Sequence, residues 1–265
     1  MSTEMNETRQ LQLHQLKILE QVITLFEDEG LTYFAIGGTA LGACRHQGFI
    51  PWDDDIDIGM PRVDYDKFLL LQDKLPKHLF IQHYSTDPDY PLYIAKVRDS
   101  STRFVEERYK QLDINHGIFI DIFPWDNIQD LPNQKRFCDD AFRRFRRCNM
   151  NKYKKKHPLK RLKTLIYKIK YGFKTSQEQF NELDMEHQRF NKNTTNILGN
   201  APFSDAIAEC DLYPLKKMNF ESIQINCPNN ITKYLSDKYG DYMVIPEEKD
   251  RITHNPTEVS FNINK

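Results

Sequence analysis

A short run of acids is the clearest chemical feature of this sequence. Residues 53–59 read DDDIDIG. From Asp55 to Ile58, acid and isoleucine alternate with the period of a β-strand. Side chains two apart on a strand share a face, so Asp55 and Asp57 point together while the isoleucines enter the core. Two carboxylates about 4 Å apart repel by roughly 4 kcal/mol at an effective dielectric of about 20. Such a pair either lies in water on a charged edge strand or holds a divalent cation, because Mg²⁺ prefers oxygen ligands.

A further acid stands alone in an apolar strand. Residues 117–123 have strand character, and they place Asp121 on the same face as Phe119 and Phe123. An ionised carboxylate among aromatic rings needs a partner. A role as third metal ligand or as general base, beside an adjacent strand, would supply one.

A pair of glycines precedes the acids. Gly37, Gly38 and Thr39 follow a short apolar strand at 33–36, and we expect Thr39 to cap a helix over 40–44. Backbone N–H groups at a helix start can bind phosphate, although a plain turn gives the same tripeptide. The glycine turn, the acid pair and the later strand acid together favour phosphoryl or nucleotidyl transfer, in which cations neutralise phosphate charge.

The elements that must position these residues follow an order typical of an α/β or α+β core with a helical extension. Further strands are expected at 79–84 and 92–97. Apolar periodicity predicts helices over 11–29, 62–74, 133–150, 158–173 and 176–192, and a short one after Pro228. We divide the chain into a catalytic core with the metal site (1–130), a basic helical region (131–195) and a C-terminal part that completes the core and the donor site (196–265).

The basic region stands out against an acidic remainder. The 265 residues carry a net charge of −1, but residues 135–174 hold sixteen Lys or Arg and two Asp, so the rest carries −15. Apolar residues recur at helical spacing over 159–173 between basic flanks, as in a helix lying in a membrane interface. A core-packing helix with a solvated basic face remains an alternative. The acidic remainder argues against nucleic-acid binding, so we expect contact with an anionic membrane instead.

Composition excludes several classes of protein. No apolar run approaches the roughly 18 residues of a membrane span, and the first ten residues are polar, unlike a signal segment. Five cysteines without a C-x-x-C pair favour neither a disulfide framework nor a cysteine zinc site. We therefore expect a cytoplasmic protein that associates peripherally with the inner face of the plasma membrane.

Three blocks of sequence carry a family resemblance. They read GTALGACRHQGFIPWDDDIDIG at 38–59, NHGIFIDIFP at 115–124 and YGDYMVIP at 239–246. Together they resemble the LicD family, which includes bacterial phosphocholine transferases and is related to fukutin-type proteins. The resemblance implies an α+β fold with a nucleotidyltransferase core of the DNA polymerase β kind, a mixed sheet flanked by helices.

The resemblance also implies a reaction. Phosphocholine would pass from CDP-choline to a sugar hydroxyl of a lipid-linked oligosaccharide, such as a teichoic-acid precursor, with Mg²⁺ or Mn²⁺ as cofactor. Asp121 would either orient the metal or deprotonate the acceptor. The implied catalytic residues are Asp55, Asp57, Asp121 and Arg45, the metal ligands are these aspartates with Asp53, and the donor-binding residues are Gly37, Gly38, Thr39, Trp52, Arg251 and His254.

Secondary candidates and alternatives remain open. Arg251 and His254, three apart, would share a helical face, and Lys96 and Arg98 alternate on a strand. A nucleotidyltransferase that attaches a nucleoside monophosphate to a small molecule or protein, and a non-catalytic membrane-associated adaptor, are the competing functions. Aromatic rings that could contact a quaternary ammonium are Trp52, Trp125, Tyr90, Tyr93 and Tyr242.

Overall fold

The structure of the protein is a computed structural model. It describes residues 7–129, 131–150, 172, 174–193, 195–200, 205–251, 253–254 and 256–263. The helix predicted over 158–173 therefore lies, Gly172 apart, outside the described residues. No helix in the described part of the chain combines the length and apolar character that crossing a bilayer requires.

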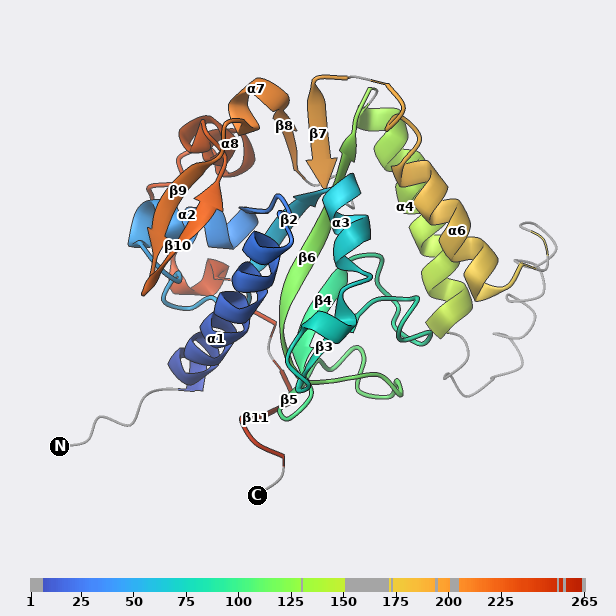
Figure 1. Ribbon diagram of the computed structural model, residues 1–265, viewed down its shortest axis with the longest axis horizontal. Coiled ribbons are helices and arrows are strands. Elements are labelled where there is room, and N and C mark those ends of the chain that lie inside the picture. The colour runs from blue at the N-terminus through green and yellow to red at the C-terminus, as the bar shows by residue number, and fades with distance from the viewer. Residues whose placement is uncertain are drawn as a thin grey trace.

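A seven-stranded mixed sheet forms the centre of the fold (Figure 1). Its strands run in the order β1-β2-β6-β4-β3, and β7 continues from the far end of β6 to β8. Only the β2–β6 pair is parallel among these described strands. The strands are β1 (Phe34–Ala35), β2 (Asp57–Pro61), β3 (Leu79–Gln82), β4 (Ala95–Asp99), β6 (Ile118–Asn127), β7 (Ile197–Asn200) and β8 (Ala206–Ala208).

Helices flank this sheet, which confirms the predicted α+β architecture. The apolar stripe of α1, including Leu19 and Phe26, is buried, as amphipathic spacing requires. Figure 1 shows α4 and α6 side by side, away from α2 and α8, and a separate apolar cluster around Phe145 and Phe180 joins them. The helices are α1 (Glu7–Asp28), α2 (Gly37–His46), α3 (Arg62–Phe68), α4 (Leu131–Met150), α6 (Ser176–His187), α7 (Glu209–Leu212) and α8 (Ile231–Tyr239).

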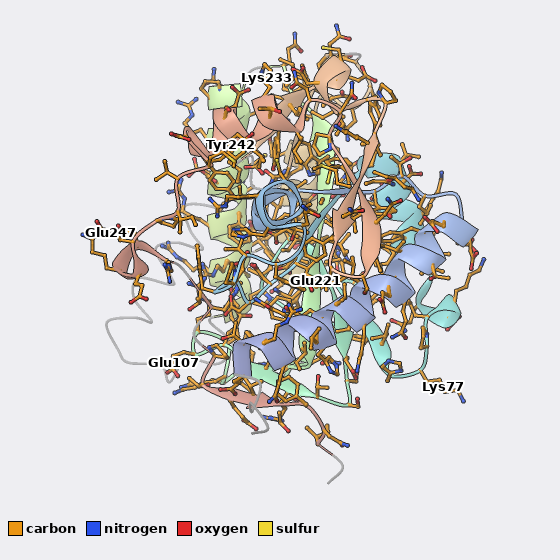
Figure 2. All side chains as sticks on the ribbon, turned by 90° about the vertical axis from the view of Figure 1, so that its left-hand side faces the viewer. Lys77, Glu107, Glu221, Lys233, Tyr242 and Glu247 are labelled. Atoms are coloured by element: carbon orange, nitrogen blue, oxygen red, sulfur yellow. The ribbon has the colours of Figure 1, made fainter. Side chains whose placement is uncertain are left out.

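Two small sheets complete the fold. The hairpin of β9 (Lys216–Phe220) and β10 (Ile223–Cys227) is held to α1 by the ion pair between Arg9 and Glu221 at 2.6 Å (Figure 2). The strand β11 (Glu258–Ser260) pairs with β5 (Arg103–Val105). This pairing brings the C-terminal segment back beside the end of the central sheet that carries the acids.

Three local expectations need correction. The helix α2 begins at Gly37 with Ile36 as its N-cap, so the predicted cap at Thr39 is wrong. The Thr39 hydroxyl instead accepts the backbone N–H of Asp57 at 2.8 Å, which ties the helix start to β2. The strand β2 begins at Asp57 rather than Asp53, and α3 ends at Phe68, before the predicted boundary at residue 74.

Candidate active site

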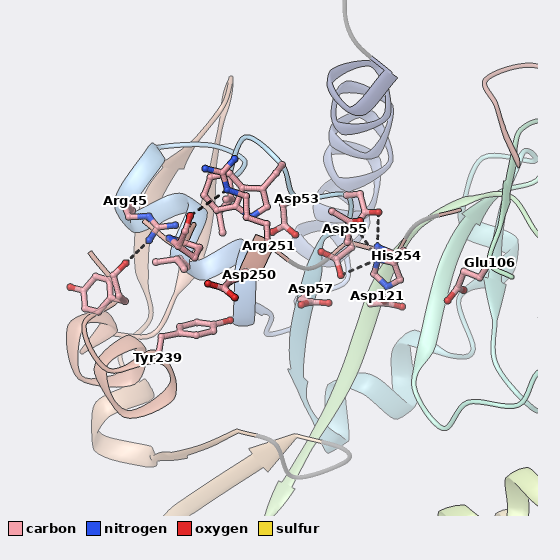
Figure 3. A pocket seen from close by; sticks show the side chains of 18 of the residues that line it. Arg45, Asp53, Asp55, Asp57, Glu106, Asp121, Tyr239, Asp250, Arg251 and His254 are labelled. Atoms are coloured by element: carbon pink, nitrogen blue, oxygen red, sulfur yellow. Dashed lines mark hydrogen bonds and ion pairs between the residues drawn. The ribbon is translucent and has the colours of Figure 1, made fainter. Parts of the chain in front are cut away.

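Three aspartates, two of them on neighbouring strands and one just before β2, converge at one end of the sheet. In the parallel β2–β6 pair, Asp57 lies directly opposite Asp121. Asp55 precedes Asp57 by two residues and points toward the same cluster (Figure 3). One carboxylate oxygen from each of the three lies within 4.8 Å of the others. The structure thus brings together the acids that the sequence singled out.

The cluster carries more negative charge than its surroundings neutralise. Burial, followed by the charge of Asp55, raises the pKa of Asp53 to about 8. Burial also raises the pKa of Asp57 well above its ordinary value, and the charges of Asp55 and Asp121 add to the effect. A divalent cation would relieve this repulsion, and hard oxygen ligands at this spacing fit Mg²⁺ or Mn²⁺.

Lys96 is the internal partner that Asp121 requires. The antiparallel β4–β6 register places Lys96 opposite Asp121, and its Nζ lies 2.6 Å from Asp121 Oδ1. The ammonium also lies 3.3 Å from the centroid of the Phe119 ring. Arg98, two residues on, is buried and donates to Gln82 and the Gly117 carbonyl, so only Lys96 of the two secondary candidates reaches the site.

The glycine pair allows the acids to approach the start of α2. A Cβ atom at Gly37 would lie 2.9 Å from Asp57 Oδ2, and one at Gly38 would lie 2.6 Å from Asp53 Oδ2. Gly37 also has a φ of +54°, which disfavours any larger residue. Its N–H donates to the Tyr234 hydroxyl at 2.9 Å, whereas Gly38 lines the cleft described next.

A cleft of about 1060 Å³ opens over the cluster, with basic groups on one wall (Figure 3). The Arg45 Nη1 donates to the Tyr242 carbonyl at 2.5 Å and thereby holds the loop that follows α8. The Arg251 guanidinium lies 4.2 Å from the centroid of the Trp52 ring. Both guanidinium groups line the cleft, so they place positive charge beside the acidic cluster.

The arrangement of aromatic rings differs from the expectation for choline contact. Trp52 and Tyr242 line the cleft, but Arg251 covers one face of Trp52. Trp125 is buried against Phe34, with ring centroids 5.1 Å apart. The remaining candidates, Tyr90 and Tyr93, are buried and do not line the cleft.

An Asp–His pair completes the polar part of the site. His254 donates its backbone N–H to Asp54 at 2.8 Å, and its Nδ1 lies 3.0 Å from the same carboxylate. Burial lowers the pKa of His254, but the Asp54 hydrogen bond and the charge of Asp55 outweigh it and raise the pKa to about 9. The imidazole is therefore a cation at neutral pH and offsets part of the acidic charge.

Sequence reasoning missed Asp54 and misjudged the local structure around His254. Asp54 was not among the predicted site residues, and no local signal links it to His254, 200 positions away. The short 3₁₀ helix Glu248–Asp250 ends before Arg251, so the predicted shared helical face of Arg251 and His254 is wrong. Both side chains reach the cleft because β11 returns the chain to β5.

Known proteins resemble this chain over most of its length, and the family match includes the acidic cluster. The family described as LicD/FKTN/FKRP, nucleotidyltransferase domain, matches residues 30–171. The chain is similar to the lipopolysaccharide cholinephosphotransferase LicD of Haemophilus influenzae, with 28% identity over 94% of this chain and 96% of the relative. It is also similar to the ribitol 5-phosphate transferase FKRP of Homo sapiens, with 46% identity over 15% of this chain and 8% of the relative.

Proposed function

This chain belongs to the LicD/FKTN/FKRP nucleotidyltransferase-domain family and is a transferase, and we propose that it moves phosphocholine from CDP-choline to a sugar hydroxyl. The convergence of Asp55, Asp57 and Asp121 within 4.8 Å carries the proposal. The cholinephosphotransferase named among its relatives supports the head group. We propose as the acceptor a lipid-linked oligosaccharide such as a teichoic-acid precursor. We also propose that the catalytic core has a nucleotidyltransferase fold of the DNA polymerase β kind.

The acidic cluster would hold the cofactor. Asp55, Asp57 and Asp121 supply three oxygen ligands, and Asp53 stands close enough to Asp55 for the two carboxyl groups to share a hydrogen bond. A bound Mg²⁺ or Mn²⁺ would supply Lewis-acid polarisation of the phosphoryl oxygens. Because Lys96 occupies Oδ1 of Asp121, we assign Asp121 to metal binding and orientation rather than to proton removal.

The wall of the cleft that carries Arg45 and Arg251 would bind and orient the donor. Arg45 and Arg251 carry fixed positive charge into the cleft, where the diphosphate of the donor requires it. Gly38 lines the cleft and lets the Asp53 carboxylate pack against the start of α2, because a Cβ atom there would lie 2.6 Å from Asp53 Oδ2. In the reaction, the acceptor oxygen forms a bond to phosphorus, the bond to the CMP oxygen breaks, and the acceptor proton passes to solvent or a base.

The basic region supports membrane association as part of this proposal. Residues 135–174 carry a net charge of +14, and the side chains of Arg136, Arg143 and Arg147 on α4 are exposed. Anionic lipid attracts such charge by about 1 kcal/mol per basic residue near the surface. Co-sedimentation with phosphatidylglycerol vesicles, lost at high salt, tests this association, and equal binding to neutral phosphatidylcholine vesicles would contradict it.

Product analysis tests the proposed reaction. Incubation with CDP-choline, a candidate lipid-linked oligosaccharide and Mn²⁺ is expected to give free CMP and a phosphocholine adduct by mass spectrometry. EDTA is expected to stop the reaction, and the Asp55→Asn variant is expected to lose turnover while keeping its circular dichroism spectrum. Release of pyrophosphate from CTP, with a nucleoside monophosphate adduct, would identify a nucleotidyltransferase instead. Failure to bind Mn²⁺ and a cytidine nucleotide together by calorimetry would favour an adaptor.

A further inference from the structure

The wall opposite the arginines holds a carboxylate that the proposed reaction has not used. Glu106 follows directly after β5 and lines the same cleft as the aspartates. Figure 3 shows it on the far side of the acidic cluster from Arg45 and Arg251. The residue is only 9% exposed. In the part of the chain that the structure describes, no hydrogen bond or ion pair reaches its carboxylate.

The cations in this region have other partners. Lys96 pairs with Asp121, and Arg98 donates to Gln82 and to the Gly117 carbonyl. Arg108 bonds to the hydroxyl of Tyr109. A carboxylate removed from bulk water is costly without a matching positive charge. Glu106 therefore places a buried carboxyl group at the cleft wall. Arg98 and Arg108 interact with it electrostatically, but no hydrogen bond or ion pair from a described side chain reaches it.

The surroundings of Glu106 narrow the kind of cation that would fit. Leu92, Ile94 and Tyr109 line the same cleft and provide apolar and aromatic surface, and Arg108 lines it as well. A hydrated metal ion or a protonated amine would leave its N–H or O–H groups facing these apolar atoms. A quaternary ammonium has methyl groups instead of donors, so it gains from an anion combined with apolar and aromatic surface.

We propose that Glu106 and the apolar residues beside it form the subsite for the cationic head group of the transferred phospho-alcohol. The inference rests on the proposed function, because it presupposes that a phospho-alcohol is transferred. The order of groups along the cleft is consistent with one donor molecule spanning it. Its diphosphate lies toward Arg45 and Arg251, its reacting phosphorus lies over the aspartates, and its head group lies against Glu106. Glu106 thereby selects a charged head group over a neutral one of the same shape.

A carbon isostere of choline isolates the charge. The 3,3-dimethylbutyl ester of CDP replaces the ammonium nitrogen by carbon and keeps the volume of the head group. The wild-type enzyme is expected to prefer CDP-choline by about 10- to 100-fold in kcat/KM, because a close charge pair strengthens binding by a factor of this size. Glu106→Gln is expected to abolish that preference by raising the KM for CDP-choline, with turnover of the isostere unchanged.

A neighbouring glutamate provides the matched control. Glu107 also lines the cleft, but it pairs with Lys110 at 2.6 Å and its side chain is 61% exposed (Figure 2). Glu107→Gln removes the same charge one residue away, and it is expected to keep the wild-type preference for CDP-choline. Loss of preference in both variants would show a general field effect and would overturn the assignment of Glu106.

Other outcomes separate this inference from the proposed function. An equal loss of turnover on both esters in Glu106→Gln, or a lower melting temperature, would indicate a structural role and overturn the inference. Weaker Mn²⁺ binding by calorimetry in Glu106→Gln would make the residue a metal ligand and also overturn it. A wild-type enzyme that transfers both head groups equally well overturns the inference but leaves the transfer reaction standing. Failure of wild type with both esters, together with pyrophosphate release from CTP, overturns the proposed function itself.

Discussion

Replacing Asp57 by Asn should stabilise the metal-free protein while it destroys the metal site. Asp57 is buried among like charges, and its carboxylate lies within 4.8 Å of those of Asp55 and Asp121. Asparagine keeps the shape of the side chain and removes the charge. Most substitutions of buried residues destabilise a protein, so a gain in stability is a distinctive result.

The size of the gain follows from Coulomb repulsion. One like-charge pair at this separation costs about 3 kcal/mol at an effective dielectric of about 20. Proteins of this size shift their melting temperature by about 2–4 °C per kcal/mol, so Asp57→Asn is expected to melt about 6–12 °C higher in EDTA. The pKa of Asp57 is raised in the folded state, so the penalty is absent below its ordinary pKa of 3.8 and grows as pH rises. The gap between variant and wild type should therefore widen from pH 5 to pH 8.

Calorimetric melting with and without Mn²⁺ is the assay. Mn²⁺ is expected to raise the melting temperature of the wild type and to leave Asp57→Asn almost unchanged. The control is Asp126→Asn on the neighbouring strand β6, because the Asp126 carboxylate accepts hydrogen bonds from Arg62 at 2.8 and 2.6 Å. Burial raises the pKa of Asp126, but the charge and hydrogen bonds of Arg62 outweigh it and lower the pKa.

The two substitutions should therefore act in opposite directions. Asp126→Asn breaks a buried ion pair and is expected to destabilise the protein by about 3–5 kcal/mol. Two results would refute the view that these carboxylates repel one another and bind a cation. One is an Asp57→Asn variant that melts below the wild type in EDTA, and the other is a wild type whose melting temperature does not change with Mn²⁺.

Three further predictions concern groups around the cluster. Lys96→Met removes the partner of Asp121 and should lower the stability of the EDTA-treated protein by about 3–5 kcal/mol, part of which Mn²⁺ restores; an unchanged melting temperature would contradict the pairing. The raised pKa of His254, about 9, means that its pairing with Asp54 stabilises the fold fully below its ordinary pKa of 6.5 and is lost as pH rises through 9. The melting-temperature difference between wild type and His254→Gln should therefore shrink between pH 6.5 and pH 9. A constant difference over this range would contradict the stabilising pairing of His254 with Asp54. Gly37→Ala forces a positive φ on a residue with a side chain, so it should lower the free energy of unfolding by about 1–2 kcal/mol. It should also weaken Mn²⁺ binding, measured by calorimetry, because the new Cβ would crowd Asp57. Wild-type stability and Mn²⁺ affinity would show that the close approach of Gly37 and Asp57 is unimportant.

The sequence by itself determined the local features of the site. The alternation of acid and isoleucine around Asp55 and Asp57 fixes which side chains share a face, because that depends only on the strand period. The same reasoning placed Phe119 on the face of Asp121, and Lys96 does lie over that ring. Periodicity also located most of the described helices and the longer strands. It failed at helix starts such as Thr39, where a tertiary hydrogen bond replaced the expected cap.

The tertiary structure decided which of these groups meet. Asp57 faces Asp121 only because β2 and β6 pair in parallel in that register, and a shift by one residue would turn Asp121 away. The pairing of β11 with β5 brings His254 to Asp54, and the course of the chain after β5 buries Glu106 in the cleft wall. A periodic pattern reports the face of a residue within its own strand, whereas neighbours across strands depend on strand order and register, which long-range packing sets.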